Sequence, residues 1–524
     1  MGIYLNPGNE NYRRALASSI YVDKTMMVDV MNRFINQSNN YICVSRPRRF
    51  GKTIAQNMIA AYYSKGCDSR EMFENLKIGD SKDFGKNLNS LNVIQIDLNS
   101  EYQNTNDKDN LISILSSKII KEMREEFVDA DLRDDYSLAE SILEVFSKTG
   151  EQFVILIDEY DVLVREQVSD ELFESYLSFL NGLFKSNTLR QAISLAYITG
   201  ILPVVRDRVQ SKLNNFMEYT IIEARELAEY VGFTSDEVRE LCKKHHMSYE
   251  ECRSWYDGYR QNGIEIYNPE SVVRAMLDKR YRSYWSMTST YRVIVDRLRQ
   301  NFKGTRDAVI RMMAGESVDV RVESYMNTMN DFETRNDIFT YLIHIGYLAY
   351  NTDNETCRIP NREILREWEF AIEVLDEYEE TDNIIQSSKE LLQATIDGDE
   401  EMVARALDTS HIHVTSNRSY NNEDALQSAI YLAYIYAINK YTIVREMTSG
   451  KGFADVVYIP LKQEDPAIII ELKRNDCTES AINQIKEKKY FYSLSHYEGN
   501  IIFVGINYDE KDKTHTCKIE RFSK

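Results

Sequence analysis

Residues 44–53 read Val-Ser-Arg-Pro-Arg-Arg-Phe-Gly-Lys-Thr, and this stretch decides the fold. The residues before it, Tyr41–Ser45, have the composition of a short buried strand, and residues 53–63 have the spacing of an amphipathic helix. A Gly-Lys-Thr that enters a helix directly after a strand is typical of loops that hold nucleotide phosphates, because loop N–H groups and the helix N-terminus face the anion. We expect Lys52 to reach the terminal phosphates of ATP or GTP and the Thr53 hydroxyl to bind Mg²⁺.

The loop departs from the usual pattern at one position. The pattern asks for glycine five residues before Gly51, and this chain has Arg46 there, followed by Pro47. The arch therefore lacks the conformational freedom that glycine normally gives it. We expect Arg46 and Arg49 to contact the nucleotide phosphates, and a basic turn that binds no ligand is the alternative.

An apolar run that ends in two acids, Phe153-Val-Ile-Leu-Ile-Asp-Glu-Tyr-Asp161, supplies a partner motif. Its pattern puts Asp158 at the carboxyl end of a buried parallel strand. There Asp158 is expected to hold Mg²⁺ through water, while Glu159 orients or deprotonates the attacking water. A pair of solvated acids at a strand end is the alternative, but the two motifs together are stronger evidence than either alone.

Further strand candidates, residues 92–98 and 193–199, are separated by helical stretches. Alternating strand and helix predicts an α/β fold with a parallel sheet covered by helices on both faces. Thr199 ends its strand with a hydroxyl that is a candidate sensor of the terminal phosphate, although an ordinary turn residue is the simpler alternative. Arg206 and Arg208 follow in a loop and are candidates to stabilise transferred charge, from this subunit or from a neighbour.

Six motifs together resemble the bacterial AAA-ATPase-like family, which is typically joined to a C-terminal domain of the PD-(D/E)XK nuclease superfamily. They are Tyr21-Val-Asp-Lys-Thr25, Ser45-Arg-Pro-Arg-Arg-Phe-Gly-Lys-Thr53, Leu156-Ile-Asp-Glu-Tyr-Asp161, Thr199-Gly-Ile-Leu202, Ser254-Trp-Tyr-Asp-Gly-Tyr259 and Tyr267-Asn-Pro269. The resemblance covers nearly the whole chain and accounts for Arg46, because this loop is the family's own variant. It implies an AAA-like P-loop ATPase capped by a helical, winged-helix-like lid.

A nuclease site also follows from the residues themselves. Residues 451–459 and 467–473 read as two strands, which we expect to form a hairpin. Residues two apart in a strand share a face, so Glu471 and Lys473 point the same way. Asp455 and Glu471 are then expected to share a divalent metal, while Lys473 positions or activates the water that attacks phosphate. Oxygen ligands with no cysteine or histidine nearby suit Mg²⁺, or Mn²⁺, rather than Zn²⁺.

Two further residues are assigned to this site. Glu446, upstream of the hairpin, is expected beside the same metal. Gln484, on the helix that follows the hairpin, is expected to face the site, because the superfamily often places a glutamine there. An amphipathic hairpin with exposed charges is the alternative interpretation of the same residues.

Length and composition bound these hypotheses. The chain has 524 residues, enough for about three domains. We divide it into an ATPase domain (1–222), a lid region (223–372), a helical linker (373–410) and a nuclease-like domain (411–524). The absence of a bilayer-spanning apolar run and of a leader at the start predicts a cytoplasmic protein with no membrane partner. Seven scattered cysteines form no metal-ligand spacing.

The net charge of −20 argues against a protein that binds nucleic acid over its whole surface, because neutralising phosphates demands basic residues. Contact with DNA therefore needs a local basic patch. Lys473-Arg474 and residues 486–489 are the candidates beside the proposed cleavage site.

The sequence thus predicts an ATPase joined to a metal-dependent nuclease, with ATP as the switch and nucleic acid, DNA in preference to RNA, as the substrate. A role in defence or mobile-element biology and assembly into a homo-oligomer are compatible with this hypothesis. The main alternative is an ATP-dependent switch that binds a protein partner and keeps the C-terminal domain as a non-cleaving scaffold. A GTP-binding signalling protein is a weaker alternative, because no Asn-Lys-x-Asp guanine-reading sequence occurs.

Overall fold

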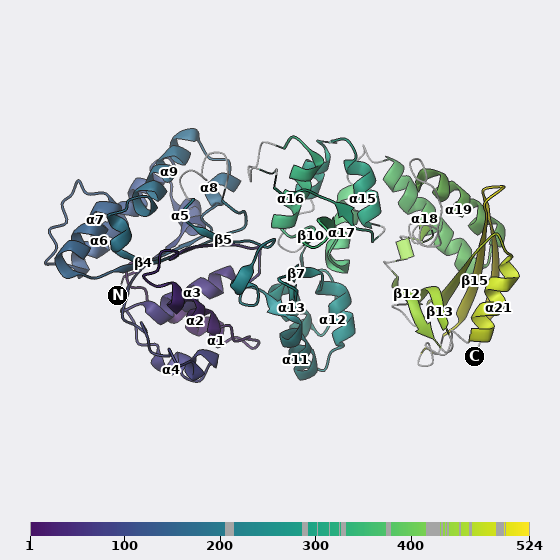
Figure 1. Ribbon diagram of the computed structural model, residues 1–524, viewed down its shortest axis with the longest axis horizontal. Helices are drawn as coiled ribbons and strands as arrows, with labels where there is room; N and C mark the ends of the chain where they lie inside the picture. Colours follow the sequence, from purple (N-terminus) through teal and green to yellow (C-terminus); the bar gives the residue numbers. More distant parts are fainter. Residues whose placement is uncertain are drawn as a thin grey trace. The chain divides into compact units, whose positions relative to one another are not determined.

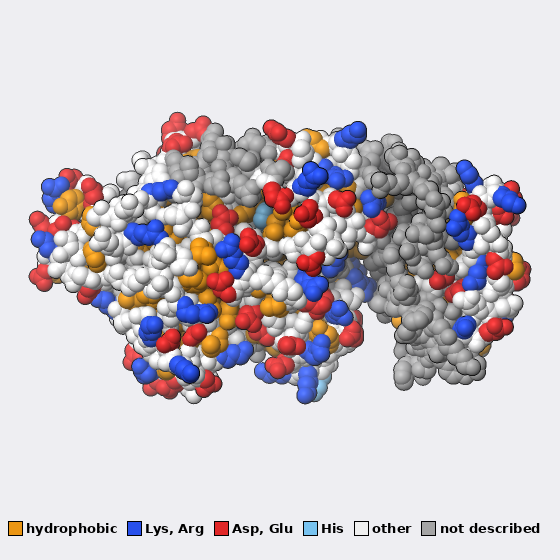
Figure 2. All heavy atoms as spheres, in the orientation of Figure 1, with side chains coloured by type: hydrophobic (Ala, Val, Ile, Leu, Met, Phe, Trp, Pro, Cys, Tyr) orange, Lys and Arg blue, Asp and Glu red, His pale blue; other side chains and the backbone are white. Residues whose placement is uncertain are grey.

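The computed structural model shows two compact units, residues 1–294 with 317–367 and residues 368–524 with 295–316 (Figure 1). The residues that it describes are 2–204, 214–285, 292–300, 302–313, 315–323, 325, 332–373, 379–414, 430, 433–434, 436–437, 440–449, 452–460, 464–488, 497 and 499–522. Acidic and basic side chains are spread over the described surface (Figure 2). Residues 295–316 lie within the predicted lid region but group with the second unit, and the predicted division into four parts stays a prediction.

The first unit is built on a sheet of five parallel strands in the order β2-β3-β4-β1-β5. The strands are β1 (Tyr41–Ser45), β2 (Asn92–Asp97), β3 (Phe153–Asp158), β4 (Ile193–Gly200) and β5 (Met217–Tyr219). Every residue of β1, β3 and β4 is buried, because helices cover both faces of the sheet. This arrangement confirms the predicted parallel α/β fold.

Helices lie on both sides of this sheet (Figure 1). One side carries α6 (Leu111–Glu126), α7 (Leu138–Thr149) and α9 (Asp170–Phe184), and the other carries α2 (Met26–Phe34) and α3 (Lys52–Tyr63). The shorter elements are α1 (Glu10–Leu16), α4 (Arg70–Phe73), η1 (Lys77–Asp80), α5 (Leu98–Asn104), α8 (Val162–Arg165), η2 (Leu189–Gln191) and η3 (Arg225–Leu227).

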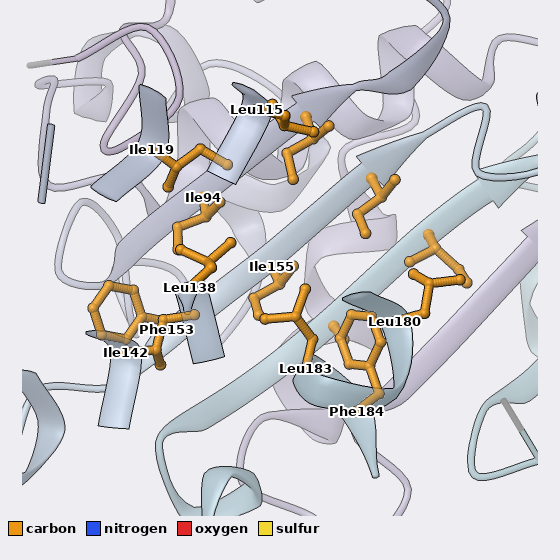
Figure 3. Close-up of a cluster of buried hydrophobic side chains, with 14 of the residues drawn as sticks. Ile94, Leu115, Ile119, Leu138, Ile142, Phe153, Ile155, Leu180, Leu183 and Phe184 are labelled. Atoms are coloured by element: carbon orange, nitrogen blue, oxygen red, sulfur yellow. The ribbon is translucent and has the colours of Figure 1, made fainter. Parts of the chain in front are cut away.

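The core between the sheet and helices α6, α7 and α9 is apolar (Figure 3). Its labelled side chains are Ile94, Phe153 and Ile155 from the strands and Leu115, Ile119, Leu138, Ile142, Leu180, Leu183 and Phe184 from the helices. Burying one Leu, Ile or Phe side chain stabilises a fold by about 1.5–3 kcal/mol. This packing fixes the strands, and with them the strand ends at which the predicted site residues lie.

The remainder of the first unit forms the lid. Its elements are β6 (Phe233–Thr234), α11 (Ser235–His245), α12 (Tyr249–Tyr256), β7 (Tyr259–Gln261), β8 (Ile264–Tyr267), α13 (Pro269–Asp278), β9 (Val318–Asp319), α16 (Arg335–His344), β10 (Ala349–Asn351) and β11 (Thr356–Arg358). The strands form two small antiparallel sheets, β6-β8-β7 and β10-β11-β9. Thr234 and Glu237 cap the start of α11 reciprocally, which is why the helix begins there.

Three further helices are α14 (Arg292–Leu298), α15 (Thr305–Met313) and α17 (Arg362–Glu373). Of the helices in the described ranges, none combines the length and hydropathy that crossing a membrane requires.

The second unit contains a mixed sheet in the order β12-β13-β14-β15-β16. Its strands are β12 (Tyr441–Ser449), β13 (Gly452–Pro460), β14 (Ala467–Arg474), β15 (Ile501–Asp509) and β16 (Thr514–Phe522). β14 and β15 are parallel and the other neighbours are antiparallel. β13 and β14 form the hairpin expected at residues 451–473.

Helices cover both faces of this sheet as well. α21 (Thr478–Lys488) connects β14 to β15 across one face, where Ile482 and Ile485 pack against Ile469 and Phe503. α18 (Glu379–Asp397) and α19 (Glu400–Val414) pack on the other face, against strand residues of opposite parity such as Ile470. The α/β fold that the sequence predicts for the C-terminal part of the chain is therefore present.

Candidate nucleotide and nuclease sites

The loop between β1 and α3 occupies the carboxyl edge of the parallel sheet, where α/β proteins bind ligands. Gly51 has a φ of +91°, a conformation that favours glycine, and α3 begins at the next residue. Arg49 also has a positive φ, of +69°, without being glycine. The turn therefore forms although the arch lacks the glycine of the usual pattern.

The ammonium of Lys52 closes this loop. Its Nζ donates hydrogen bonds to the carbonyl oxygens of Arg46 and Pro47, both at 2.9 Å, and the residue is 6% exposed. Burial lowers the pKa of Lys52 to about 8, and the negative charges of Asp158 and Glu159 oppose that shift. Lys52 thus lies inside the loop that sequence reasoning assigned to phosphate, bonded to loop carbonyls.

Strand pairing brings three of the predicted residues together. The Thr53 hydroxyl donates to Asp158 Oδ2 at 2.6 Å, and the Thr199 hydroxyl donates to Asp158 Oδ1. Asp158 ends β3 and Thr199 lies near the end of the neighbouring β4. Burial raises the pKa of Asp158, while the two hydroxyl hydrogen bonds act in the opposite direction. A carboxylate beside a hydroxyl is an oxygen donor set that suits Mg²⁺.

Glu159 is bound to a residue that the sequence analysis missed. Its carboxylate forms an ion pair with Arg165, the last residue of α8. Arg165 Nε also lies 3.2 Å from Asp161 Oδ2, and that oxygen accepts hydrogen bonds from the backbone N–H groups of Ile201 and Leu202. The i,i+4 spacing of Asp161 and Arg165 was the available sequence signal.

The two loop arginines contact protein groups. The guanidinium of Arg46 is fully buried and donates to the carbonyl oxygens of Ser45 (2.9 Å) and Tyr219 (2.7 Å), so it ties β1 to β5. Burial lowers the pKa of Arg46 to about 10. Arg49 pairs with Glu270 of α13 at 3.2 Å. The Nε and Nη2 atoms of Arg46 are buried without a hydrogen-bond partner among the described residues, and the phosphate contact that we expected for Arg46 stays a prediction.

The lid holds the outer side of the same loop. The rings of Phe50 and Tyr259 meet edge to face, with centroids 5.5 Å apart. The Tyr259 hydroxyl donates to the carbonyl oxygen of Gly346 at 2.5 Å, and a Cβ placed on Gly346 would approach Pro47 Cβ to 2.9 Å. Tyr259 belongs to one of the six motifs, so the structure gives that motif a contact with the phosphate loop.

A cavity of about 600 Å³ opens at this loop. Its lining includes loop and helix residues Arg48, Arg49, Phe50, Gly51, Lys52 and Thr53, the acid Glu159, and an apolar wall of Ile20, Val22, Ile54, Met58 and Phe233. Binding pockets of this size, mostly apolar with a few polar groups, hold ligands as large as a nucleotide. Lys24 also lines the cavity and pairs with Glu237 of α11 at 2.5 Å, which joins the cavity wall to the lid.

The second site lies on β13, β14 and α21. Lys473 Nζ donates to Gln484 Oε1 at 2.6 Å and to Glu471 Oε1 at 3.3 Å, and Gln484 Nε2 also donates to Glu471 Oε1. Asp455 Oδ2 accepts the N–H of Leu472 at 2.7 Å, which holds the Asp455 carboxylate against β14. The structure therefore brings Asp455, Glu471, Lys473 and Gln484 together as predicted from the sequence.

Glu471 has the properties of a metal ligand. It is 2% exposed, and its Oε2 atom is buried without a hydrogen-bond partner among the described residues. Burial raises the pKa of Glu471 to about 7, the negative charge of Asp455 adds to this shift, and Lys473 opposes it. An unpartnered buried carboxylate oxygen beside a second carboxylate fits a divalent cation such as Mg²⁺ or Mn²⁺. Among the described residues, however, no group of three or more acidic, histidine or cysteine side chains forms a metal site.

Three of the predicted positions lie wholly or partly outside the described residues. Arg206 and Arg208 are in the undescribed segment 205–213, and the side chain of Glu446 in β12 is not described. Their proposed roles stay predictions.

Two family models match separate parts of the chain. Residues 8–210 match a family described as a predicted AAA-ATPase, and residues 421–518 match the PD-(D/E)XK nuclease superfamily. The two matches confirm the predicted order of an ATPase-like domain followed by a nuclease-like domain.

Comparison with two individual proteins adds less evidence than the family models do. A protein from Azotobacter chroococcum mcd 1, named "Uncharacterized protein in vnfD 5'region", is 25% identical over 306 residues, which are 57% of this chain and 56% of the relative. The chain thus matches only about half the length of that relative. The Aeropyrum pernix ORC2 structure, in its ADPNP and ADP complexes, aligns over 66% of this chain and 93% of ORC2 with 7% identity and a TM-score of 0.22. A TM-score this low carries no argument.

Proposed function

We propose that this chain, with its ATPase-like and nuclease-like domains, hydrolyses ATP and cleaves nucleic acid in a metal-dependent reaction, and that nucleotide state controls cutting. The observation that carries the nuclease part is the buried Glu471 Oε2, which has no partner in the described part of the chain and lies beside Asp455 and Lys473. A purely structural hairpin has no need to bury a carboxylate oxygen without a partner, because doing so costs about 1–3 kcal/mol.

At the front site, Lys52 exchanges its two loop carbonyls for the nucleotide phosphates. Thr53 and Asp158 would hold Mg²⁺, which supplies positive charge against the phosphates when bound. Glu159 orients the attacking water, Thr199 holds Asp158, and the apolar wall with Ile20 and Met58 receives the base. Binding of ATP rather than GTP is part of this proposal.

At the second site, Asp455 and Glu471 would hold Mg²⁺ or Mn²⁺, which polarises the phosphodiester when bound. Lys473 positions the attacking water. Gln484 is a positioning residue, because it is bonded to both Lys473 and Glu471 and so fixes their separation. Glu446 is a further candidate ligand on the adjacent β12.

The finer parts of the proposal concern the substrate and setting. DNA is favoured over RNA as the substrate, the protein acts in the bacterial cytoplasm, and its role belongs to defence or mobile-element biology. A homo-oligomer is compatible with the proposal, since arginines for the ATPase site can come from a neighbouring subunit.

The test is cleavage of labelled single- and double-stranded DNA and RNA with Mg²⁺ or Mn²⁺, with and without ATP. Cutting by the wild type that is lost in Glu471→Ala and kept in the exposed-loop control Glu464→Ala is the expected result. Lys52→Ala should abolish ATP hydrolysis and the effect of ATP on cutting. Absence of cutting with every substrate would contradict the nuclease part.

An ATP-dependent switch with a non-cleaving scaffold domain is the second candidate. The observation that favours it is that Glu471, Lys473 and Gln484 are hydrogen-bonded to one another in pairs, because such mutual hydrogen bonds can also serve a structural purpose. ATP hydrolysis by the wild type without cutting of any substrate would support this candidate.

A further inference from the structure

Two lid helices end next to each other, and both ends carry basic residues. Lys279, which caps the end of α13, donates its Nζ to the carbonyl oxygen of His245 at the end of α11, at 2.7 Å. We define the basic patch as the side chains at these two helix ends: Lys243, Lys244, His245, His246, Lys279, Arg280 and Arg282. All are exposed except His245, which is half-buried. Figure 2 shows Lys, Arg and His side chains together where α11 ends in Figure 1.

Few acids neutralise this patch. The ion pair described within it joins Arg282 to Asp278 at 2.8 Å. Asp236 and Glu237 lie in the first turn of α11, and Glu237 is bound to Lys24. Glu240 lies one turn before Lys243 and Lys244 and is the one acid of α11 near the patch. Burial lowers the pKa of His245, and the positive charges of Lys279, Lys244 and His246 lower it further. The patch is therefore a site of positive potential on a chain whose net charge is −20.

The helix dipoles do not require so many cations. A basic residue near a helix C-terminus stabilises the helix by about 0.3–1 kcal/mol, and the effect is confined to the last turn. Additional like charges repel one another, and the chain has enough acids to neutralise them. An unneutralised cluster across two helix ends suits a ligand with repeated negative charges.

Three of the four described basic residues that the sequence proposed beside the cleavage site are engaged. Lys473 bonds to Gln484 and Glu471, Arg474 pairs with Glu510 at 2.7 Å, and Lys486 pairs with Glu520 at 2.6 Å, whereas Lys488 is exposed. On the lid, by contrast, seven basic or histidine side chains gather at two adjoining helix ends.

We propose that the basic patch binds the phosphate backbone of the nucleic acid substrate. This inference rests on the proposed nuclease function and adds a docking surface on the ATPase unit. Lys and Arg bind phosphates without reading sequence, so the patch retains the substrate on the chain while the metal site cuts it. The retained substrate stays at a raised effective concentration for the second unit, because one chain carries both.

The experiment measures binding of fluorescein-labelled double-stranded DNA by the full chain in EDTA, which prevents cutting, at several salt concentrations. Lys243→Glu/Lys244→Glu is compared with Lys82→Glu/Lys121→Glu, which changes the net charge equally at exposed lysines outside the patch. We expect the patch variant to bind at least tenfold more weakly at low salt. We also expect its slope of log K against log salt to fall by about 2, since each lost phosphate contact removes about 0.9.

The outcomes separate the two hypotheses. Equal binding by the two double variants, with wild-type DNA binding and cutting intact, would overturn the patch alone. A wild type that neither binds nor cuts any nucleic acid would contradict the proposed function itself. If the patch variant binds DNA as the wild type does but no longer binds polyglutamate, the ligand of the patch is an acidic protein and not nucleic acid. Circular dichroism and ATP turnover equal to the wild type show that a variant is folded.

Discussion

Glu159 follows β3 with a φ of +53°, a conformation that costs a non-glycine residue energy. Arg165 and Asp161 hold it there, and Asp161 is itself fixed by two backbone N–H groups. Arg165 is 11% exposed and Asp161 is 1% exposed by side chain. The orientation of the residue proposed to act on water is therefore set by a buried ion-pair network.

Arg165→Ala should lower the free energy of unfolding by about 3 kcal/mol, because it leaves Asp161 buried without its cation. We also expect kcat for ATP to fall roughly tenfold with KM nearly unchanged, since Glu159 loses its orientation while the phosphate loop stays intact. Steady-state ATPase kinetics and thermal unfolding measure both effects, and Arg165→Lys should recover part of each. An unchanged kcat would show that Glu159 needs no such support.

Gln484→Ala should reduce nucleic acid cleavage by roughly 10–100-fold without affecting ATP hydrolysis, because Lys473 and Glu471 lose their shared partner. The matched control is Asn483→Ala, an exposed position on the same helix. Equal cutting by the two variants would argue that Gln484 only packs α21 against the sheet.

At the scale of elements, the lid and the phosphate loop form one structure. Gly346 has a φ of +89°, and a Cβ there would meet Pro47 and Trp285 at 2.9 Å. Gly263 has a φ of +80° with no atom within 4 Å of such a Cβ. Gly346→Ala and Gly263→Ala therefore carry similar backbone strain, and only the first displaces the loop. We expect a several-fold higher KM for ATP in Gly346→Ala alone. Similar KM values in the two variants would show that the lid does not affect nucleotide binding.

Helix α17 carries a buried acid, Glu363, that accepts hydrogen bonds from the N–H groups of Tyr284 and Trp285 and from the Ser271 hydroxyl. Burial raises the pKa of Glu363 to about 7 from an ordinary value of 4.5, against the effect of these hydrogen bonds. The folded state therefore binds the proton more tightly than the unfolded state. Its contribution to stability is complete below pH 4.5 and is lost as the pH rises through about 7.

The pKa values of Glu367 and Glu471 are also raised to about 7 by burial, so these residues titrate over the same range. The contribution of Glu363, which we expect to be about 3 kcal/mol, is therefore the difference in pH dependence between the wild type and Glu363→Gln in chemical denaturation between pH 5 and 8. Glu363→Gln should remove this part of the pH dependence. A wild-type stability that rises over the same range would show that the three hydrogen bonds keep Glu363 ionised.

The site residues that could be predicted from the sequence are those that lie on a single strand or directly after it. Gly51, Lys52, Thr53 and Asp158 follow from local patterns. Arg165 was missed because its pairing with Glu159 and Asp161 depends on the direction of its side chain. The lid contacts of Tyr259 were missed because they join segments that are far apart in the chain. Arg46 shows the same limit, since only the pairing of β1 with β5 reveals its buried partner, the carbonyl of Tyr219.

At the scale of the whole molecule, the two units should respond separately to ligands. ATP with Mg²⁺ at 100 times its Kd should stabilise the first unit by about 2.7 kcal/mol and leave the second unit unchanged. Differential scanning calorimetry of the full chain is expected to show one transition that shifts with ATP and one that does not. Lys52→Ala should abolish the shift, and a single transition that moves as a whole would show that the units unfold together.

Lys52 in its closed loop has a consequence for the pace of turnover. In the proposed reaction, phosphate would have to take the ammonium away from two carbonyl oxygens, and departure of the product would return it to them. The loop would thus compete with the nucleotide for the same cation. We therefore expect weaker binding of the product and rapid exchange of ADP in place of long retention.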